Sequence, residues 1–476
     1  MEEYAVTYER IVLNGYQIEH ILTLEMHENI NDHGHMHLTA VIPEELAEQY
    51  VYMTTPMMPI TLSYQTDDNK METLCRGIVT NIQVNCQGNT YYMDLTVKGK
   101  SYAMDIVERA RSFQKTSMTV HQLIREVMSE YGDCDCIIQI PDERVKRLVV
   151  QYKETDWDFL KRFVSHYGAV LIPDMESEKL TLFVGIPENT ESYSINPYQY
   201  NLVKKIDEYL RIKENRWEDA LETDFTVFQV WDYRIFRVGN EIIFNNAALR
   251  VQSVQRVLQD GVLKNQYDLR RKNGLRGLEL HNDMIVGISL TGQVTKVSRD
   301  KVMVQLIIDK PGRAAYWFPY STMSASPDGS GWYCMPEKGD QVRVYFPTDK
   351  EADAYAVSAV SGYEPKPGDT EDLMANPDVK YLKTKADQVI QFAEEGIVLN
   401  SGNGQATILL GNNGQLAIYG NTDVSVTAKK TLSLISNGQL VVGATESVCL
   451  ERGKNTSITL EGNGAIRMKA TKIYSN

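Results

Sequence analysis

An apolar residue recurs at a step of eight along the C-terminal part of the chain. The series begins at Ile408, and its steps are 8, 8, 8, 8, 8, 10 and 8 residues. A second apolar residue stands two positions after each one, and the residue between them varies. The pairs are Ile408 and Leu410, Leu416 and Ile418, Val424 and Val426, Leu432 and Leu434, Leu440 and Val442, Val448 and Leu450, Ile458 and Leu460, and Ile466 and Met468. Alternate residues of a strand share a face, so each unit is predicted to be a short strand with both members of its pair facing inward.

So regular a repeat indicates a solenoid. Eight extended residues span about 26 Å at roughly 3.3 Å per residue, which is short for one chain to close a filled coil. Three chains winding together would share each coil, bring the apolar pairs to a common axis and hide nearly all strand edges. A solenoid made by a single chain is the alternative, and the period alone does not exclude it.

The sequence ahead of the repeat also carries β patterns. Period-two alternation over 35–41 and 91–97 predicts strands in the first hundred residues, and strands return over 220–270. Residues 283–362 read as a small closed barrel such as an OB-fold, with strands divided by Gly, Pro and Asp turns. The strands expected in this barrel include 285–290, 301–308, 341–346 and 354–360.

Helical patterns are confined to short segments. Apolar residues recur at helical spacing over 118–132 and 155–167, and glycines at 132 and 168 are suitable stops. Thr155 is a suitable N-cap for the second of these helices. A shorter helix is predicted over 42–48, with proline in its first turn.

Charge and composition exclude some functions. The 476 residues carry a formal net charge of −14, whereas a phosphate backbone or an anionic membrane attracts basic patches. The acidic N-terminus lacks the apolar core of a secretory signal, so we expect assembly in the cytoplasm without a signal peptide. Cysteines are scattered, and only Cys134 and Cys136 lie close together, a weak metal signal. The six cysteines are Cys75, Cys86, Cys134, Cys136, Cys334 and Cys449.

Two further groups are candidates for chemistry. On one strand, His33, His35 and His37 would share a face, and two of them could bind zinc or iron; a wet strand face or an interface is the more ordinary interpretation. Glu451 and Glu461 occupy equivalent repeat positions and could form the carboxylate pair of a glycan-cleaving β-helix, although solvated turns are the simpler explanation. The sequence contains no G-x-S-x-G, H-E-x-x-H or P-loop motif, so we expect no enzyme and no cofactor.

Three segments carry a family resemblance. Residues 150–160 read VQYKETDWDFL and are similar to the QYxETDWxFL signature of VgrG proteins and phage central tail spikes. Residues 336–346 follow the pattern P-x-x-G-D-x-V-x-V-x-F and resemble the OB-fold of that family. The octad repeat resembles the family's β-helical needle. Together the three matches span most of the chain, in the order that the family shows.

The resemblance implies a fold and a division of the chain. The expected fold is mainly β with an α+β insertion: tail-hub domains resembling β-barrels, an OB-fold collar and a triple-stranded β-helix needle formed by a trimer. The hub region that docks on the tube would cover 1–275, with the insertion at about 106–215. The OB-fold would follow over 276–364, a linker over 365–390 and the needle over 391–476.

The resemblance also implies a function and partners. The chain would be the spike of a contractile injection apparatus, namely a phage tail, a tail-like bacteriocin, an extracellular injection system or type VI secretion. A homotrimer would cap a hexameric inner tube, contact baseplate proteins, carry a PAAR-type tip protein and pierce the target envelope on firing, with no nucleic acid as partner. The alternatives are a tailspike that cleaves or binds glycans through its β-helix, and a receptor-binding adhesin.

Overall fold

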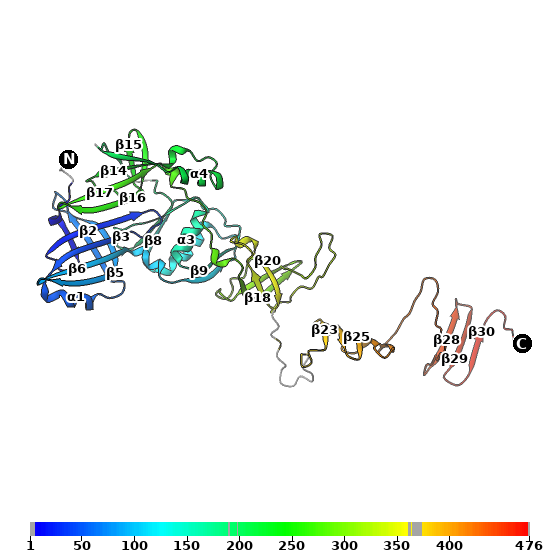
Figure 1. Ribbon diagram of the computed structural model, residues 1–476. Helices are drawn as coiled ribbons and strands as arrows, with labels where there is room; N and C mark the ends of the chain where they lie inside the picture. The colour runs from blue at the N-terminus through cyan, green and yellow to red at the C-terminus, as the bar shows by residue number, and fades with distance from the viewer. Residues whose placement is uncertain (1–4, 189–190, 198, 360–362, 364–373, 475–476) are drawn as a thin grey trace. The chain divides into compact units, whose positions relative to one another are not determined.

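The computed structural model describes residues 5–188, 191–197, 199–359, 363 and 374–474 (Figure 1). The chain divides into two compact units, residues 1–362 and 363–476. Among the described residues, no helix has the length and apolar character needed to cross a membrane.

A twelve-stranded sheet organises the first unit, and two distant parts of the chain build it. Strands β2 and β16 pair antiparallel, from Ser253 opposite Asn29 to Val257 opposite Glu25, and join the two parts (Figure 1). In sheet order the strands are β1 (Ile11–Asn14), β4 (Pro59–Gln65), β5 (Met71–Gln87), β6 (Thr90–Gly99), β3 (His35–Ile42), β2 (His20–Asn29), β16 (Ala247–Gln259), β17 (Val262–Arg270), β14 (Thr226–Asp232) and β13 (Tyr200–Lys204), with β15 (Glu241–Phe244) beside β16 and β12 (Ser192–Ser194) beside β15.

Period-two burial places one core on each part of this sheet. In β3 the even-numbered residues from Met36 to Ile42 are buried, as the predicted alternation requires. One apolar cluster lies under β1–β6 and a second under β14–β17. Arg256 is buried where the two parts meet; it pairs with Glu28 and donates to the carbonyl of Phe236.

A small α/β insertion follows β6. Strand β7 (Arg109–Phe113) pairs with β9 (Val149–Glu154), and β11 (Leu180–Val184) lies between β10 (Leu171–Pro173) and the parallel strand β8 (Cys134–Ile138). Helices α2 (Val120–Met128) and α3 (Asp156–Ser165) pack their apolar faces into the insertion core.

The predicted helices are confirmed with small shifts in their ends. The hydroxyls of Thr119 and Thr155 cap α2 and α3, and Gly132 and Gly168 have positive φ after them. The short helix predicted over 42–48 begins later, because Pro43 precedes a 3-10 turn that leads into α1 (Ala47–Met53). Helix α4 (Ile206–Asn215) was not predicted. The described part of the chain also has 3-10 helices at Tyr8–Arg10, Glu44–Leu46, Lys100–Asp105, Ser129–Tyr131, Glu222–Phe225, Lys272–Leu275, Asp283–Ile285 and Glu351–Asp353.

A five-stranded barrel ends the first unit. Its strands are, in order, β20 (Trp317–Pro319), β19 (Lys301–Leu306), β18 (Ser289–Ser298), β21 (Gln341–Tyr345) and β22 (Tyr355–Ala359). A bridge between Tyr320 and Ala356 joins its two edges. The strand predicted over 285–290 is wrong: Asn282 caps a 3-10 turn there, and β18 begins only at Ser289. Val360, the predicted end of the last strand, lies outside the described residues.

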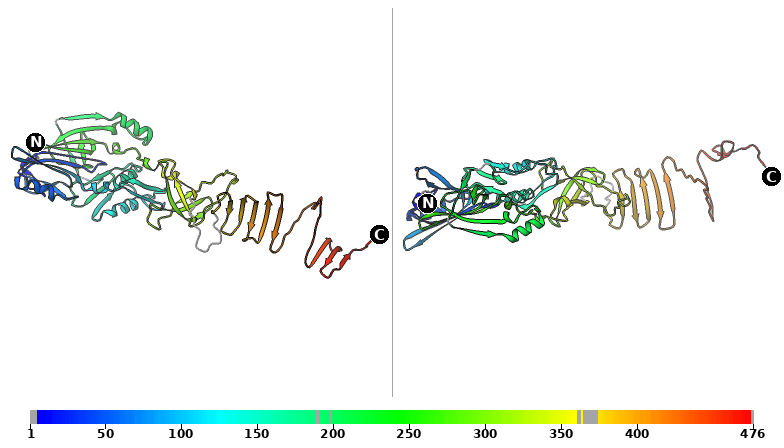
Figure 2. Two further views of the ribbon diagram at one scale, coloured as in Figure 1. Left: turned by 60° about the horizontal axis from the view of Figure 1, so that its bottom comes forward. Right: turned by 90° about the horizontal axis from the view of Figure 1, so that it is seen from above.

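The second unit contains two antiparallel ladders of short strands (Figure 2). The first has β23 (Lys380–Lys383), β24 (Val389–Ala393), β25 (Gly396–Ser401), β26 (Ala406–Gly411) and β27 (Leu416–Gly420), and the second has β28 (Ser447–Arg452), β29 (Thr456–Glu461) and β30 (Ile466–Lys469). β23 falls within the segment expected to be linker. Because successive strands reverse direction, the described residues of one chain form a meander and not a closed single-chain solenoid, which was the alternative to the expected three-chain needle.

Candidate functional site

The first ladder of the second unit has one apolar face. Ile397 on β25 stands opposite Leu410 on β26, which in turn stands opposite Leu416 on β27. The strand register adds a second row through Leu399, Ile408 and Ile418, and β24 contributes Ile390 and Phe392. None of these side chains is buried, and Leu416 is 62% exposed. Contiguous exposed apolar surface of this kind ordinarily marks a site of interaction in soluble proteins.

The second ladder repeats the arrangement. Its strand register aligns the apolar pairs of β28, β29 and β30, while the residues between the pairs point to the other face. The aligned apolar residues are Val448, Leu460 and Ile466 in one row and Leu450, Ile458 and Met468 in the next. The other face carries Cys449, Thr459 and Arg467. The predicted inward residues of these strands therefore share one face, and the part of the chain that the structure describes buries none of them.

Three octads between the ladders form no strand at all. Residues 421–446 have the same spacing as their neighbours, yet their paired apolar side chains are between 53% and 66% exposed. These side chains are Val424, Val426, Leu432, Leu434, Leu440 and Val442. An isolated short strand gains no ladder hydrogen bonds, so these octads need strands from elsewhere to order them.

The signature segment over 150–160 is a joint between the insertion and the barrel. On β9, Val149 belongs to the insertion core, whereas Val150 is buried in the barrel core and Tyr152 packs against it; Leu148, just before the strand, is also buried in the barrel core. Gln114, after β7, donates to the carbonyl of Val304 at 3.1 Å. Two cores thus meet on the two faces of one strand.

Asp156 is the buried acceptor at the centre of this joint. Its carboxylate accepts hydrogen bonds from Arg111 and Tyr131 at 2.6 Å each and from Gln151 at 2.9 Å, and its Oδ2 lies 3.0 Å from Nε of Arg109. Burial, with the carboxylate beside it, raises the pKa of Tyr131, which therefore stays a donor. The signature residues Gln151 and Asp156 thus stabilise the fold through buried hydrogen bonds.

A second buried charge group links the insertion to the barrel. Arg162 on α3 pairs with Glu154 at 2.5 Å and with Glu351 of the barrel at 2.9 Å, and it donates to the carbonyl of Val150 at 2.8 Å. Burial raises the pKa of Glu154, and the arginine opposes that rise. Because all three charged side chains are nearly inaccessible, their relative positions are tightly fixed.

The histidine prediction needs correction. His33, His35 and His37 do not share a face, because β3 begins at His35 and His33 lies in the preceding turn. The His33 ring is buried 4.0 Å from the ring of Trp157, with Ser101 Oγ at 3.0 Å and Asp105 Oδ2 at 3.2 Å, and burial lowers its pKa.

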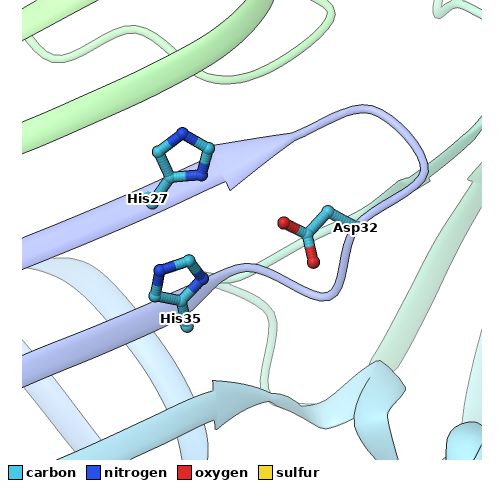
Figure 3. A group of neighbouring side chains, drawn as sticks. All are labelled: His27, Asp32 and His35. Carbon is cyan, nitrogen blue, oxygen red and sulfur yellow. The ribbon is translucent and has the colours of Figure 1, made fainter.

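His35 gains partners that the sequence pattern did not indicate. It stands directly opposite His27 on β2, and Asp32 from the turn approaches both rings (Figure 3). His37 lies two residues further along β3, opposite Glu25. Cross-strand pairing, which requires the hairpin register, is the signal that would have identified His27.

The remaining candidates do not assemble. In the β28–β29 pair, Glu451 stands opposite Ser457 and Glu461 opposite Ser447, so the two carboxylates lie at opposite ends, about 13 Å apart along the strands. That exceeds the separation used by glycoside hydrolases. All six cysteines are free, and Cys134 and Cys136 pack against the insertion core.

Two family models match separate parts of the first unit. Residues 27–225 match the family model of the phage tail baseplate hub, and residues 290–360 match that of the type VI secretion system and phage-baseplate injector OB domain. No curated protein matches the sequence.

Solved structures show the same fold at low sequence identity. The E. coli c3393 protein is described as a type VI secretion component similar to the T4 tail proteins gp27 and gp5; it is 14% identical, with a TM-score of 0.53 over 74% of this chain and 99% of that one. A chain of the half-lidded Francisella PdpA–VgrG complex is 8% identical, with a TM-score of 0.55 over 87% and 88% of the two chains. The predicted resemblance to VgrG and central tail spikes is confirmed, as is the mainly β fold with its OB domain.

Proposed function

We propose that this chain is the trimeric central spike of a contractile injection apparatus, which caps the inner tube and pierces the target envelope. The observation that carries the proposal is the uncovered apolar face of the octad repeat. Fully burying a Leu, Ile, Val or Met side chain stabilises a fold by about 1.5–3 kcal/mol, and in the single chain fifteen of the sixteen paired side chains are exposed, with Val448 half-buried.

Other copies of the chain are the natural cover for this face. The copies carry the same period, so their strands can continue the ladders and supply partners for residues 421–446. The three copies would turn their apolar faces to one axis and leave the mixed faces outward. Such a needle buries strand edges and needs no catalytic residue.

The first unit supplies the docking end in this proposal. The match of residues 27–225 to the phage tail baseplate hub supports this role. The first unit would sit on the hexameric inner tube and contact baseplate proteins. A PAAR-type tip protein would close the free end of the needle. The spike would be part of a phage-tail-like particle and would be driven through the target envelope on firing. The glycan-cleaving alternative gains nothing from Glu451 and Glu461, which lie at opposite ends of their strand pair.

Solution mass tests the proposal, with a matched pair of variants on one strand. Three copies of the 54.1-kDa chain weigh about 162 kDa, measured by light scattering after size exclusion. Ile458→Lys with Leu460→Lys places six charges on the proposed axis and should reduce the mass to that of one chain. The control, Ser457→Lys with Thr459→Lys, alters the other face of β29 and should remain trimeric.

Two results would contradict the proposal. A folded wild-type monomer would exclude the shared needle. Equal loss of mass in both double variants would show that β29 tolerates no lysines on either face, and the apolar face would then have no special part in assembly.

A further inference from the structure

We propose that the hairpin joining β2 to β3 binds a divalent transition-metal ion of the zinc class through His27, Asp32 and His35 (Figure 3). The site lies in the hub domain and is independent of the assembly proposed above. Cross-strand pairing, the shape of the turn and the hydrogen bonding of the hairpin support it.

The three side chains already converge. His27 and His35 are direct cross-strand partners, and their rings stack with centroids 5.4 Å apart and planes 23° apart. One ligand atom from each of the three residues lies within 4.8 Å of the others. Zinc at about 2.0–2.1 Å from each donor atom requires donor atoms about 3.4 Å apart. Side-chain rotations that move these atoms by about an ångström would therefore complete the site.

The turn holds Asp32 over the strands. Asn31 and Gly34 both have positive φ, which folds the chain tightly back at the hairpin end. Asn31 exchanges two hydrogen bonds with Leu171 of β10, at 2.7 and 2.8 Å. The backbone N–H of His33 donates to Asp32 Oδ1 at 2.7 Å, which orients the carboxylate and leaves Oδ2 for an ion. Ligands oriented in this way bind metal with little reorganisation.

Unsatisfied polar atoms gather at this end of the hairpin. Nδ1 of His27 is buried and has no hydrogen-bond partner in the described structure. The same holds for Oδ1 of Asn29, two residues along the same face of β2, and for Oε1 of Gln252, whose backbone carbonyl accepts from Ile30 in the turn. Buried polar atoms are ordinarily satisfied, and a bound ion with its water accounts for such a group.

The donor set selects the kind of ion. Two imidazoles and one carboxylate suit zinc and its first-row neighbours, whereas calcium and magnesium prefer oxygen ligands alone. Three protein ligands leave a fourth position for water or for a group from a partner. Lys98, opposite His35 on β6, is the nearby cation that opposes binding; its ammonium lies 4.1 Å from the centroid of the Tyr102 ring, which accommodates its charge.

Zinc titration of the full chain tests the site. With a chromogenic chelator as competitor, the wild type should bind one zinc ion per chain. His27→Gln and His35→Gln should each weaken binding at least tenfold, and Asp32→Asn should weaken it less. His37→Gln is the matched control, since it lies on the same strand face two residues away, and it should bind as the wild type does.

Cobalt distinguishes this site from a cysteine site. Cobalt bound by two imidazoles and a carboxylate gives visible d–d bands without the near-ultraviolet thiolate charge-transfer band that Cys134 or Cys136 would produce. Binding that survives both His27→Gln and His35→Gln, a thiolate band, or no binding by the wild type would overturn the proposal. Tryptophan fluorescence would verify that each variant folds, because Trp157 packs beside this turn.

Discussion

The two units of the chain carry the same period-two pattern and reach opposite outcomes. On β3 of the hub, Leu38 is fully buried; on β27 of the repeat, Leu416 is 62% exposed. The pattern determines which residues share a face, but whether that face is covered depends on a second layer. In the hub, other segments of the same chain cover the apolar face of the sheet. In the described residues of the repeat, no such layer covers the apolar face.

Connection length explains the difference. Hub strands that are more than 200 residues apart pair with each other, as β2 and β16 do, and the insertion and barrel pack back on their neighbours. In the repeat, turns of a few residues allow each strand to reach only the next one. A meander of this kind exposes both faces, so its apolar face is uncovered in the single chain.

Removal of the Asp156 carboxylate should give the largest loss of stability, and the loss should be confined to the first unit. Asp156→Ala removes the fully buried carboxylate that Arg111 and Tyr131 donate to, leaves Glu130 as the acidic partner of Arg111, and should lower the unfolding free energy of residues 1–362 by about 3–5 kcal/mol. All five tryptophans lie in this unit, so their fluorescence in urea reports it alone. Asp158→Ala, an exposed change in the same helix turn, should cost less than about 1 kcal/mol. Equal losses would refute the role of burial.

Acid should act on the hub through His166. Burial and the neighbouring Arg147, Arg162 and His281 lower its pKa from 6.5 to about 3. The unfolded chain therefore takes up the proton first, and hub stability should fall by about 2 kcal/mol between pH 6.5 and 5. His166→Gln should remove that part of the slope in urea unfolding measured at several pH values. An unchanged slope would show that His166 titrates normally.

The smallest effect should come from a helix cap. The Thr119 hydroxyl accepts from the backbone N–H of Gln122, so Thr119→Ala should cost the hub about 1 kcal/mol. Ser117→Ala, exposed and just outside the helix, is the control and should cost almost nothing. Neither variant should change the mass of the assembled protein, because the repeat lies in the other unit. A fall in mass with Thr119→Ala would show that assembly depends on the stability of the first unit.

The sequence was sufficient for features that depend on local period. Alternation predicted β3 and β6, helical spacing and caps predicted α2 and α3, and the octads predicted which repeat residues share a face. The predicted strand over 285–290 failed because Asn282 starts a 3-10 turn, a side-chain effect that outweighs an apolar run. Helix α4 was missed because only Ile212 on it is buried, which gives a weak apolar stripe.

The histidines show what period cannot provide. His33 continues the spacing of His35 and His37, yet the turn directs it into a buried contact with Trp157. His27 lies eight residues before His35 and becomes its partner through the hairpin register alone. Pairing across strands is a tertiary property, and a single sequence contains no direct record of it.

Strand β9, which gives alternate residues to two cores, also limits how the gene can recombine. A segment exchanged between related genes keeps its fold only if its whole core travels with it. Residues 283–359 inherited alone would place Leu148 and Val150 against a foreign barrel and would separate Glu351 from Arg162. Hub, insertion and barrel should therefore be inherited as one block, while crossovers after β22 can exchange the repeat for one of another length.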